Sequence, residues 1–141
     1  MSPRRVAFQV STRSPEEILD VTDKVQGAVR ELSIEDGFVV LFCPHTTCAL
    51  TVNEAADPDV REDVSSALSA LVPKIPFRHG EGNSPAHFRA ALLGPTLLLP
   101  VEGGRLALGT WQGVYLCEFD GPRRRSVWAY PLTVDGPGGP S

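Results

Sequence analysis

The chain has 141 residues and a formal net charge of −4, with 42% hydrophobic and 21% charged residues. This composition is that of an ordinary globular protein and excludes collagen-like, coiled-coil and wholly disordered chains. The length predicts one domain, residues 1–134, followed by a flexible tail over residues 135–141. The pI near 5.3 argues against a nucleic-acid partner. No apolar run reaches the roughly 20 residues that cross a bilayer, so no membrane partner is expected.

The first half of the chain predicts a strand, a helix, two strands and a second helix. Alternating apolar residues at Val6, Phe8 and Val10 are typical of a strand with one buried face. Apolar residues at helical spacing predict a helix over residues 22–32. The β-branched and aromatic run 37–43 and the segment 48–53 predict strands. A second amphipathic helix is predicted over 57–72, where a good N-cap, Asp57, precedes a proline at the first helical position.

The second half predicts a short helix followed by strands. This helix covers residues 85–93 and ends at a glycine. Apolar segments separated by turn-forming Gly, Asp and Pro residues predict strands over 95–101, 105–108, 114–119 and 125–132. Because this order is not a regular alternation of strands and helices, it predicts an α+β fold with helices on an antiparallel or mixed sheet.

The cysteines indicate a reducing compartment. There are three of them, an odd number in no paired framework, and the N-terminal residues lack the apolar stretch of a signal peptide. We therefore expect a cytoplasmic protein. Cys43 stands two residues before His45, which makes it a conceivable metal ligand or nucleophile, although a buried small apolar side chain is the commoner use of cysteine.

The histidines are the main candidates for chemistry. All three, His45, His79 and His87, lie in the middle of the chain. Each has an ordinary interpretation: a hydrogen-bonded residue at a strand end, a solvated loop residue and a solvent-facing helix residue. Taken together, two histidines on either side of a helix start and a third from a strand end can converge on one point. Three imidazoles with an open fourth position are typical of zinc or a similar divalent transition metal.

Several polar and aromatic residues have two interpretations each. Glu54 can orient a histidine, act as a base or cap the following helix. Glu118 lies in an apolar strand, where it needs either a functional role or an arginine partner, Arg124 or Arg125. Trp111 can stack on a flat ligand or pack in the core, and Gln112 lies beside glycines that allow close backbone approach.

The motifs of the chain closely resemble those of the YjbQ-like family. The resemblance is carried by CPHTTCALTVNEAADPDVREDV, by GNSPAH and by GTWQGVYLCEFDGP, and it covers residues 6–132. It implies a compact α+β domain with a folded-over mixed or antiparallel sheet, two main helices and one short helix, assembled as a homotrimer. It also implies a metal or anion site at the histidines, with Glu54, Asn83, Gln112 and Glu118 near it. Cys48 stands where many relatives carry another small residue.

Some family members are described as secondary thiamine-phosphate synthases, which join a pyrimidine diphosphate to a thiazole phosphate and release pyrophosphate. Such a reaction needs stabilisation of the departing anion by a divalent metal and basic groups. The resemblance therefore implies that Arg78 or Arg89 meets a phosphate, that Trp111 stacks on a ring and that backbone amides at the start of the short helix add an anion cradle. A site of histidines fits transition metals better than the Mg²⁺ that phosphate chemistry prefers, which indicates that this activity is a side reaction.

Three hypotheses for the function follow. The first is a small metal-dependent enzyme acting on a phosphorylated or anionic small molecule. The second is a non-catalytic protein that binds a metal or a small ligand, and the third is an oligomeric scaffold with a structural polar pocket. The candidate catalytic residues are Glu54, Gln112 and Glu118, and the candidate metal ligands are His45, His79 and His87. The candidate ligand-binding residues are Thr46, Thr47, Asn53, Arg78, Asn83, Ser84 and Trp111.

Overall fold

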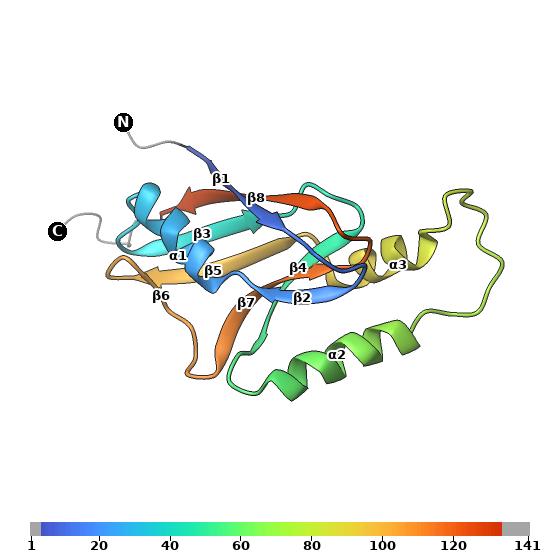
Figure 1. The fold of residues 1–141 in the computed structure, drawn as a ribbon. Coiled ribbons are helices and arrows are strands. Elements are labelled where there is room, and N and C mark those ends of the chain that lie inside the picture. Colours follow the sequence, from blue (N-terminus) through green and yellow to red (C-terminus); the bar gives the residue numbers. More distant parts are fainter. Residues whose placement is uncertain (1–3, 134–141) are drawn as a thin grey trace.

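The computed structural model describes residues 4–133, so the predicted tail, 135–141, lies outside the described residues. Within this range, strands and helices follow one another in nearly the predicted order (Figure 1). The helices are α1 (Thr22–Glu31), α2 (Pro58–Ala70) and α3 (Ser84–Leu93). The strands are β1 (Val6–Ser11), β2 (Glu17–Asp20), β3 (Gly37–Phe42), β4 (Cys48–Glu54), β5 (Thr96–Glu102), β6 (Arg105–Leu106), β7 (Gln112–Glu118) and β8 (Arg124–Leu132).

Local sequence explains where the helices begin and end. Asp57 caps α2, since its side chain accepts a hydrogen bond from the backbone N–H of Asp59 at 2.9 Å. Pro58 follows at the first helical position, where no N–H is needed. Helix α3 ends at Gly94, whose φ of +92° is a conformation that side chains rarely adopt.

The strands form two antiparallel sheets. The larger sheet has the order β1-β8-β3-β5-β6, and the smaller has the order β2-β7-β4. Every paired neighbour runs antiparallel. The fold is therefore α+β, as predicted. Of the two kinds of sheet that the sequence allowed, antiparallel or mixed, the structure has the antiparallel one.

The smaller sheet is the middle layer of the molecule. One of its faces packs against the larger sheet and α1 in the main core, which includes Val25, Leu41, Leu116 and Val127. Its other face packs against α2 and α3 in a second apolar cluster that includes Cys117. Because both faces are covered, β7 is buried from its second residue to its last.

The outer face of the larger sheet is apolar and has no helix on it within residues 4–133. Alternation along β3, β5 and β8 turns Val39, Leu99 and Val127 inward, so their neighbours face outward. Phe42, Leu98 and Leu132 on that outer side are 37%, 56% and 44% exposed. An apolar sheet face of this kind is typical of an interaction surface.

Two strand predictions need correction. Strand β2 was not predicted; it is a four-residue strand with charged residues at both ends, and it forms because it pairs with the buried strand β7. The strand expected over 105–108 is only Arg105–Leu106; the Ala107 N–H still donates to the Pro100 carbonyl of β5 at 2.9 Å, and the paired register ends at Leu106. None of the described helices has the length and apolarity that a membrane crossing requires.

Candidate functional site

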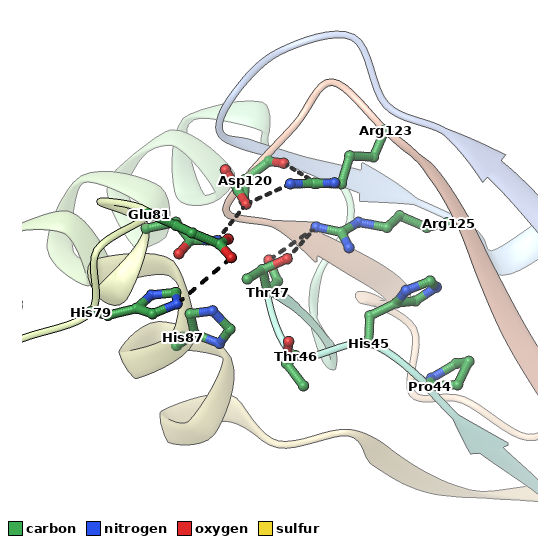
Figure 2. Close-up of a pocket in the computed structure, with 11 residues that line it drawn as sticks. Pro44, His45, Thr46, Thr47, His79, Glu81, His87, Asp120, Arg123 and Arg125 are labelled. Atoms are coloured by element: carbon green, nitrogen blue, oxygen red, sulfur yellow. Dashed lines mark hydrogen bonds and ion pairs between the residues drawn. The ribbon is translucent and has the colours of Figure 1, made fainter.

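Three segments that are distant in the sequence form an open polar pocket of about 460 Å³ (Figure 2). The loop between β3 and β4 provides one side, the loop and first turn of α3 provide another, and the corner between β7 and β8 provides the third. All three histidines lie on the wall of this pocket. The residues that line it are Pro44, His45, Thr46, Thr47, His79, Glu81, Asn83, His87, Asp120, Arg123 and Arg125.

His45 replaces a backbone partner in the larger sheet. The ladder between β3 and β8 reaches the pair Phe42 and Trp128, after which the chain turns away. The N–H of Ser126 then donates to His45 Nε2 at 2.9 Å. Because that nitrogen must keep its lone pair for this bond, the imidazole is neutral with its proton on Nδ1. Burial, together with the charge of Arg125, lowers the pKa of His45.

The rings of His79 and His87 pack edge to face on the pocket wall. Their ring centroids are 5.3 Å apart, with the rings edge to face at 80°. His79 lies in the loop before α3, and His87 lies in the first turns of that helix, so the helix start brings the pair together. Glu81 Oε1 is 4.0 Å from His79 Nε2. The His79 side chain is 42% exposed, which leaves this pair open to a ligand.

Asn83 connects α3 to the β7–β8 corner. Its Nδ2 donates to Asp120 Oδ2 at 3.0 Å, and Arg123 donates to the same oxygen at 2.9 Å. The hydrogen bond from Asn83, and then that from Arg123, lower the pKa of Asp120. Asn83 Oδ1 is buried and accepts no hydrogen bond from the residues described. The pocket wall therefore carries an ionised carboxylate beside an unmet acceptor.

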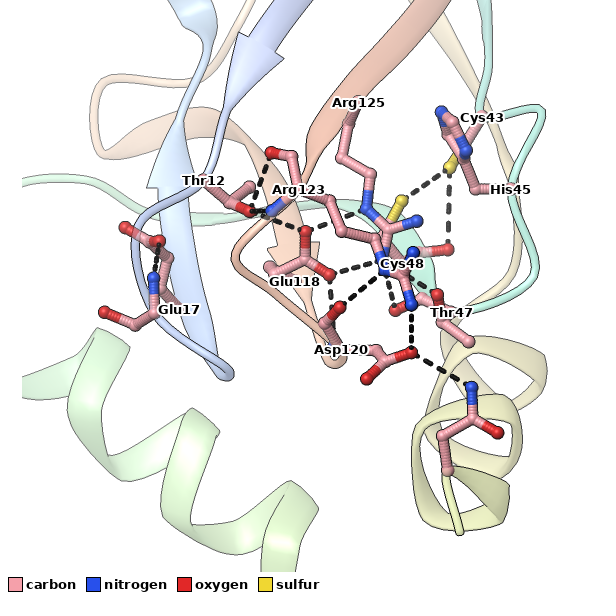
Figure 3. Close-up of polar contacts among 12 residues, drawn as sticks. Thr12, Glu17, Cys43, His45, Thr47, Cys48, Glu118, Asp120, Arg123 and Arg125 are labelled. Atoms are coloured by element: carbon pink, nitrogen blue, oxygen red, sulfur yellow. Dashed lines mark hydrogen bonds and ion pairs between the residues drawn. The ribbon is translucent and has the colours of Figure 1, made fainter. Parts of the chain in front are cut away.

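A buried ion pair forms the floor of the pocket (Figure 3). Glu118 is fully buried and accepts two hydrogen bonds from Arg125, one of them 2.8 Å from Nε. Thr12 and the Asp120 N–H also donate to its carboxylate, at 2.9 and 3.0 Å. Burial alone would raise the pKa of Glu118, but these hydrogen bonds hold it below its usual value. Arg125 continues to Thr47, donating to Oγ1 at 2.8 Å. Arg125, rather than Arg124, is therefore the partner of Glu118, and this carboxylate holds the floor in place.

Two thiols lie directly beneath the loop that carries His45. Cys43 Sγ and Cys48 Sγ are 3.2 Å apart, and both residues are 1% exposed. This contact lowers the pKa of Cys43 and raises that of Cys48. Cys117 lies in the second apolar cluster, where burial raises its pKa to about 12.

The structure brings the three histidines to one pocket but not to one set of ligands within a chain. His45 Nε2 already accepts the N–H of Ser126, while His79 and His87 pair with each other. Within residues 4–133, no three His, Cys, Asp or Glu side chains are grouped closely enough to hold a metal ion. A metal site that includes all three histidines therefore stays a prediction.

Four candidate residues lie at the other end of the smaller sheet. The register pairs Cys48 with Glu118 near the pocket, and Glu54 with Gln112 at the far end. Glu54 lies six residues after Cys48 along the strand, a distance of about 20 Å. The placement expected for Glu54 and Gln112, beside the histidines, is therefore not the one in the structure. Asn53 and Trp111 adjoin them at the same end.

The contacts at this far end are local. Glu54 Oε2 accepts the N–H of Ala56 at 2.8 Å, so it stabilises the turn that leads to α2, whereas the cap of that helix is Asp57. Gln112 Oε1 accepts the N–H of Gly109 at 2.8 Å. Trp111 is 64% exposed, which excludes the core-packing interpretation for this side chain within the described chain.

The remaining expectations divide between the pocket and its surroundings. Thr46, Thr47 and Asn83 line the pocket, whereas Arg78 and Ser84 do not. Arg89 is 5% exposed and binds Glu16 Oε1 at 2.8 Å, so it ties α3 to the segment before β2 and is not placed to meet a phosphate.

Sequence reasoning missed Asp120, Arg123 and Glu81 as pocket residues. Asp120 and Arg123 belong to the turn between β7 and β8, which was interpreted as a turn and as the end of a family motif, with no place in the site. Glu81 stands two residues after His79, in the same polar loop. The available signal was Asp120, a charged residue in the turn immediately after Glu118. That turn closes over the end of the smaller sheet, where the pocket lies.

Comparisons with known proteins agree with this architecture. The family model described as UPF0047 protein YjbQ-like matches residues 6–133. The UPF0047 protein YugU of Bacillus subtilis is 43% identical over 123 residues, which cover 86% of this chain and 93% of that protein. A UPF0047 protein of Methanocaldococcus jannaschii is 43% identical over 122 residues, covering 86% and 88%.

Solved structures agree as well. The crystal structure of an uncharacterised YjbQ/UPF0047-family protein from Clostridium acetobutylicum has a TM-score of 0.85 and 44% identity, covering 90% of this chain and 99% of that one. A conserved hypothetical protein from Thermus thermophilus has a TM-score of 0.83 and 49% identity, with the same two coverages. The chain therefore belongs to the YjbQ-like UPF0047 family.

Proposed function

We propose that the pocket binds a divalent transition metal through His79 and His87 and takes an anionic, phosphorylated small molecule beside it. The observation that carries this proposal is the adjacent pair of imidazoles, 5.3 Å apart between centroids, on the wall of a polar pocket of about 460 Å³. Imidazole nitrogens bind zinc and similar ions at about 2.0–2.1 Å, and two adjacent rings can both reach one ion. Two protein ligands leave coordination positions for water and for the small molecule.

The arginines on the pocket wall support an anionic ligand. Arg123 and Arg125 both line the pocket. Their bonds to Asp120, Glu118 and Thr47 use Nε and one terminal nitrogen of each guanidinium. The other terminal nitrogen of each arginine makes no hydrogen bond to the described residues, so two donors remain for a phosphate or carboxylate. The unmet Oδ1 of Asn83 accepts a donor from the same ligand.

We infer a metal-dependent transferase, and the candidate reaction is the synthesis of thiamine phosphate described for some members of the family. A divalent ion supplies stabilisation of negative charge on a departing pyrophosphate. The residues of this chain position the reactants: His79 and His87 hold the ion, and Arg123 and Arg125 bind the phosphate. Asn83 orients the nitrogen-containing partner through its carbonyl oxygen.

A binding protein without catalysis is the second candidate, and one observation favours it. Glu118 is committed to Arg125, and Glu54 lies at the far end of the smaller sheet. Asp120 and Glu81 are the carboxylates that line the pocket in the described chain, and Asp120 is held ionised by its neighbours. With His79 and His87 bound to the metal and His45 bonded to Ser126, the pocket of one chain offers strong binding groups and few free groups that can accept and return a proton.

We also propose that the protein assembles as a homotrimer in the cytoplasm. The uncovered face of the larger sheet, with Phe42, Leu98 and Leu132 exposed, supports an interface between copies. The free thiols support a reducing compartment. Light scattering after size exclusion measures the assembly, and Leu98→Glu should reduce it to smaller species.

Metal binding tests the site. Purified protein is stripped with a chelator and titrated with Zn²⁺ or Mn²⁺ by calorimetry. One ion per chain is expected, and His79→Ala and His87→Ala should each weaken binding at least about tenfold. The matched control is His45→Gln, which should leave affinity unchanged because His45 already accepts from Ser126. Equal loss in all three variants would support the three-histidine site, and unchanged binding in all three would refute a histidine site.

Turnover separates the two candidates. The metal-loaded protein is incubated with a hydroxymethylpyrimidine diphosphate and a thiazole phosphate, and released pyrophosphate is measured. Turnover that falls in Asn83→Ala while metal affinity is retained would support the enzyme. Tight binding of a phosphorylated ligand without turnover would support the binding protein.

A further inference from the structure

The two cysteines that flank the His45 loop lie in direct contact. Cys43 follows the last residue of β3, and Cys48 is the first residue of β4. Their sulfurs are 3.2 Å apart, about 1.2 Å longer than a disulfide bond. The segment between them carries Pro44, His45, Thr46 and Thr47, all of which line the pocket. Figure 3 shows the two sulfurs beside Arg125 and the loop.

A small molecule can reach this pair from a second cavity. Cys48 is only 1% exposed, yet it lines a cavity of about 280 Å³ together with Thr46, His87 and Ala90. His45, Thr46 and His87 line both this cavity and the main pocket, so the two adjoin. The third thiol, Cys117, is fully buried in the separate apolar cluster under α2 and α3.

We propose that Cys43 and Cys48 are a reversible dithiol–disulfide site, oxidised by peroxides that enter the second cavity. One sulfur attacks an oxygen of hydrogen peroxide, the O–O bond breaks and a sulfenic acid forms with release of water. The other sulfur then attacks the sulfenic sulfur, the S–O bond breaks and a second water leaves. The two thiols lose two electrons and two protons, and the peroxide gains them to become two waters. A dithiol reductant reverses the change.

This oxidation would shorten the distance between the two ends of the loop 44–47, which lines the pocket. Moving the sulfurs from 3.2 Å to about 2.04 Å draws together the ends of a loop whose Thr47 binds Arg125 and whose His45 binds Ser126. The dithiol proposal depends only on the contact between the two sulfurs, so it can be refuted without affecting the proposed metal and phosphate binding, and the reverse also holds.

Peptide mapping of the full-length protein tests the proposal. Reduced protein is treated with hydrogen peroxide, unfolded in the presence of an alkylating agent and digested. The expected products are a Cys43–Cys48 disulfide, one alkylated cysteine at Cys117 and an intact mass lower by two hydrogen atoms. Dithiothreitol should restore all three thiols. Cys117→Ser is the matched control and should form the same disulfide with no thiol remaining.

Other products would overturn the proposal. Three free thiols after treatment would show that the pair does not react. A gain of oxygen atoms at Cys43 or Cys48 without a disulfide would show that the sulfurs do not join. A disulfide that includes Cys117 or links two chains would show that another pair is preferred. Each of these outcomes is read on the unmutated chain, so the result does not depend on whether Cys43→Ser or Cys48→Ser folds.

Discussion

Removing the carboxylate of Glu118 should be among the most destabilising changes in the molecule. Glu118 is fully buried, and the side chain of its partner Arg125 is 4% exposed. Glu118→Ala leaves a buried guanidinium without a counter-charge and leaves the Asp120 N–H without its acceptor. Breaking a buried pair in this way costs about 3–5 kcal/mol. For a chain of this size each kcal/mol lowers Tm by roughly 3 °C, so we expect a fall of about 10–15 °C.

Urea unfolding and thermal melts of matched variants measure this effect. Asp120→Ala breaks the pair with Arg123, whose side chain is 53% exposed, and the hydrogen bond from Asn83, and should cost only about 1–2 kcal/mol. The double variant Glu118→Leu/Arg125→Met removes both charges and should recover most of the stability that Glu118→Ala loses.

The difference in stability loss between Glu118→Ala and Asp120→Ala tests whether the buried ion pair holds the pocket floor. If Glu118→Ala costs no more than Asp120→Ala, the buried pair does not hold the pocket floor. A double variant as unstable as Glu118→Ala would show that lost packing, rather than an unpaired charge, causes the damage.

Two further predictions concern His45 and two glycines. The folded-state pKa of His45 lies below its unfolded value of about 6.5, so the unfolded chain takes up the proton first and stability falls as pH drops below about 6.5. His45→Gln keeps an acceptor for Ser126 and should show a shallower loss between pH 7.5 and 5.5 in urea titrations; an identical slope would refute a neutral, half-buried His45. Gly113→Ala places a Cβ 2.9 Å from Ala55 Cβ and should cost about 1–3 kcal/mol, whereas Gly27→Ala, a helical site with no atom within 4 Å, should stabilise by about 0.5–1 kcal/mol. Equal Tm shifts for the two glycine variants would contradict the close approach at Gly113.

The helices were predictable because their signals are local. Val25, Ala28 and Val29 recur at helical spacing and are all buried in α1. Strand β2 was not predictable in the same way, because Glu17–Asp20 is too short and too charged to stand out. It becomes a strand only through its pairing with β7, and pairing between distant segments is a tertiary property.

The site was predictable where its residues are close in sequence. His79 and His87 are separated by one loop and a helix start, and their rings do pack against each other. The part played by His45 depends on where β3 leaves β8, which the sequence does not reveal. The separation of Glu54 from the pocket depends on the strand register. The two ends of β4 are about 20 Å apart, although both belong to one sequence motif.

The order of synthesis sets a condition on folding. Strand β8 is made last among the described elements, yet it lies between β1 and β3 and joins Val6 to Ala129 across almost the whole chain. Until β8 leaves the ribosome, the edges of β1 and β3 that it will cover have no neighbour, so the larger sheet can be completed only once β8 has emerged. A nascent chain that stops before Arg124 therefore offers two unpaired strand edges to chaperones and to other unfinished chains.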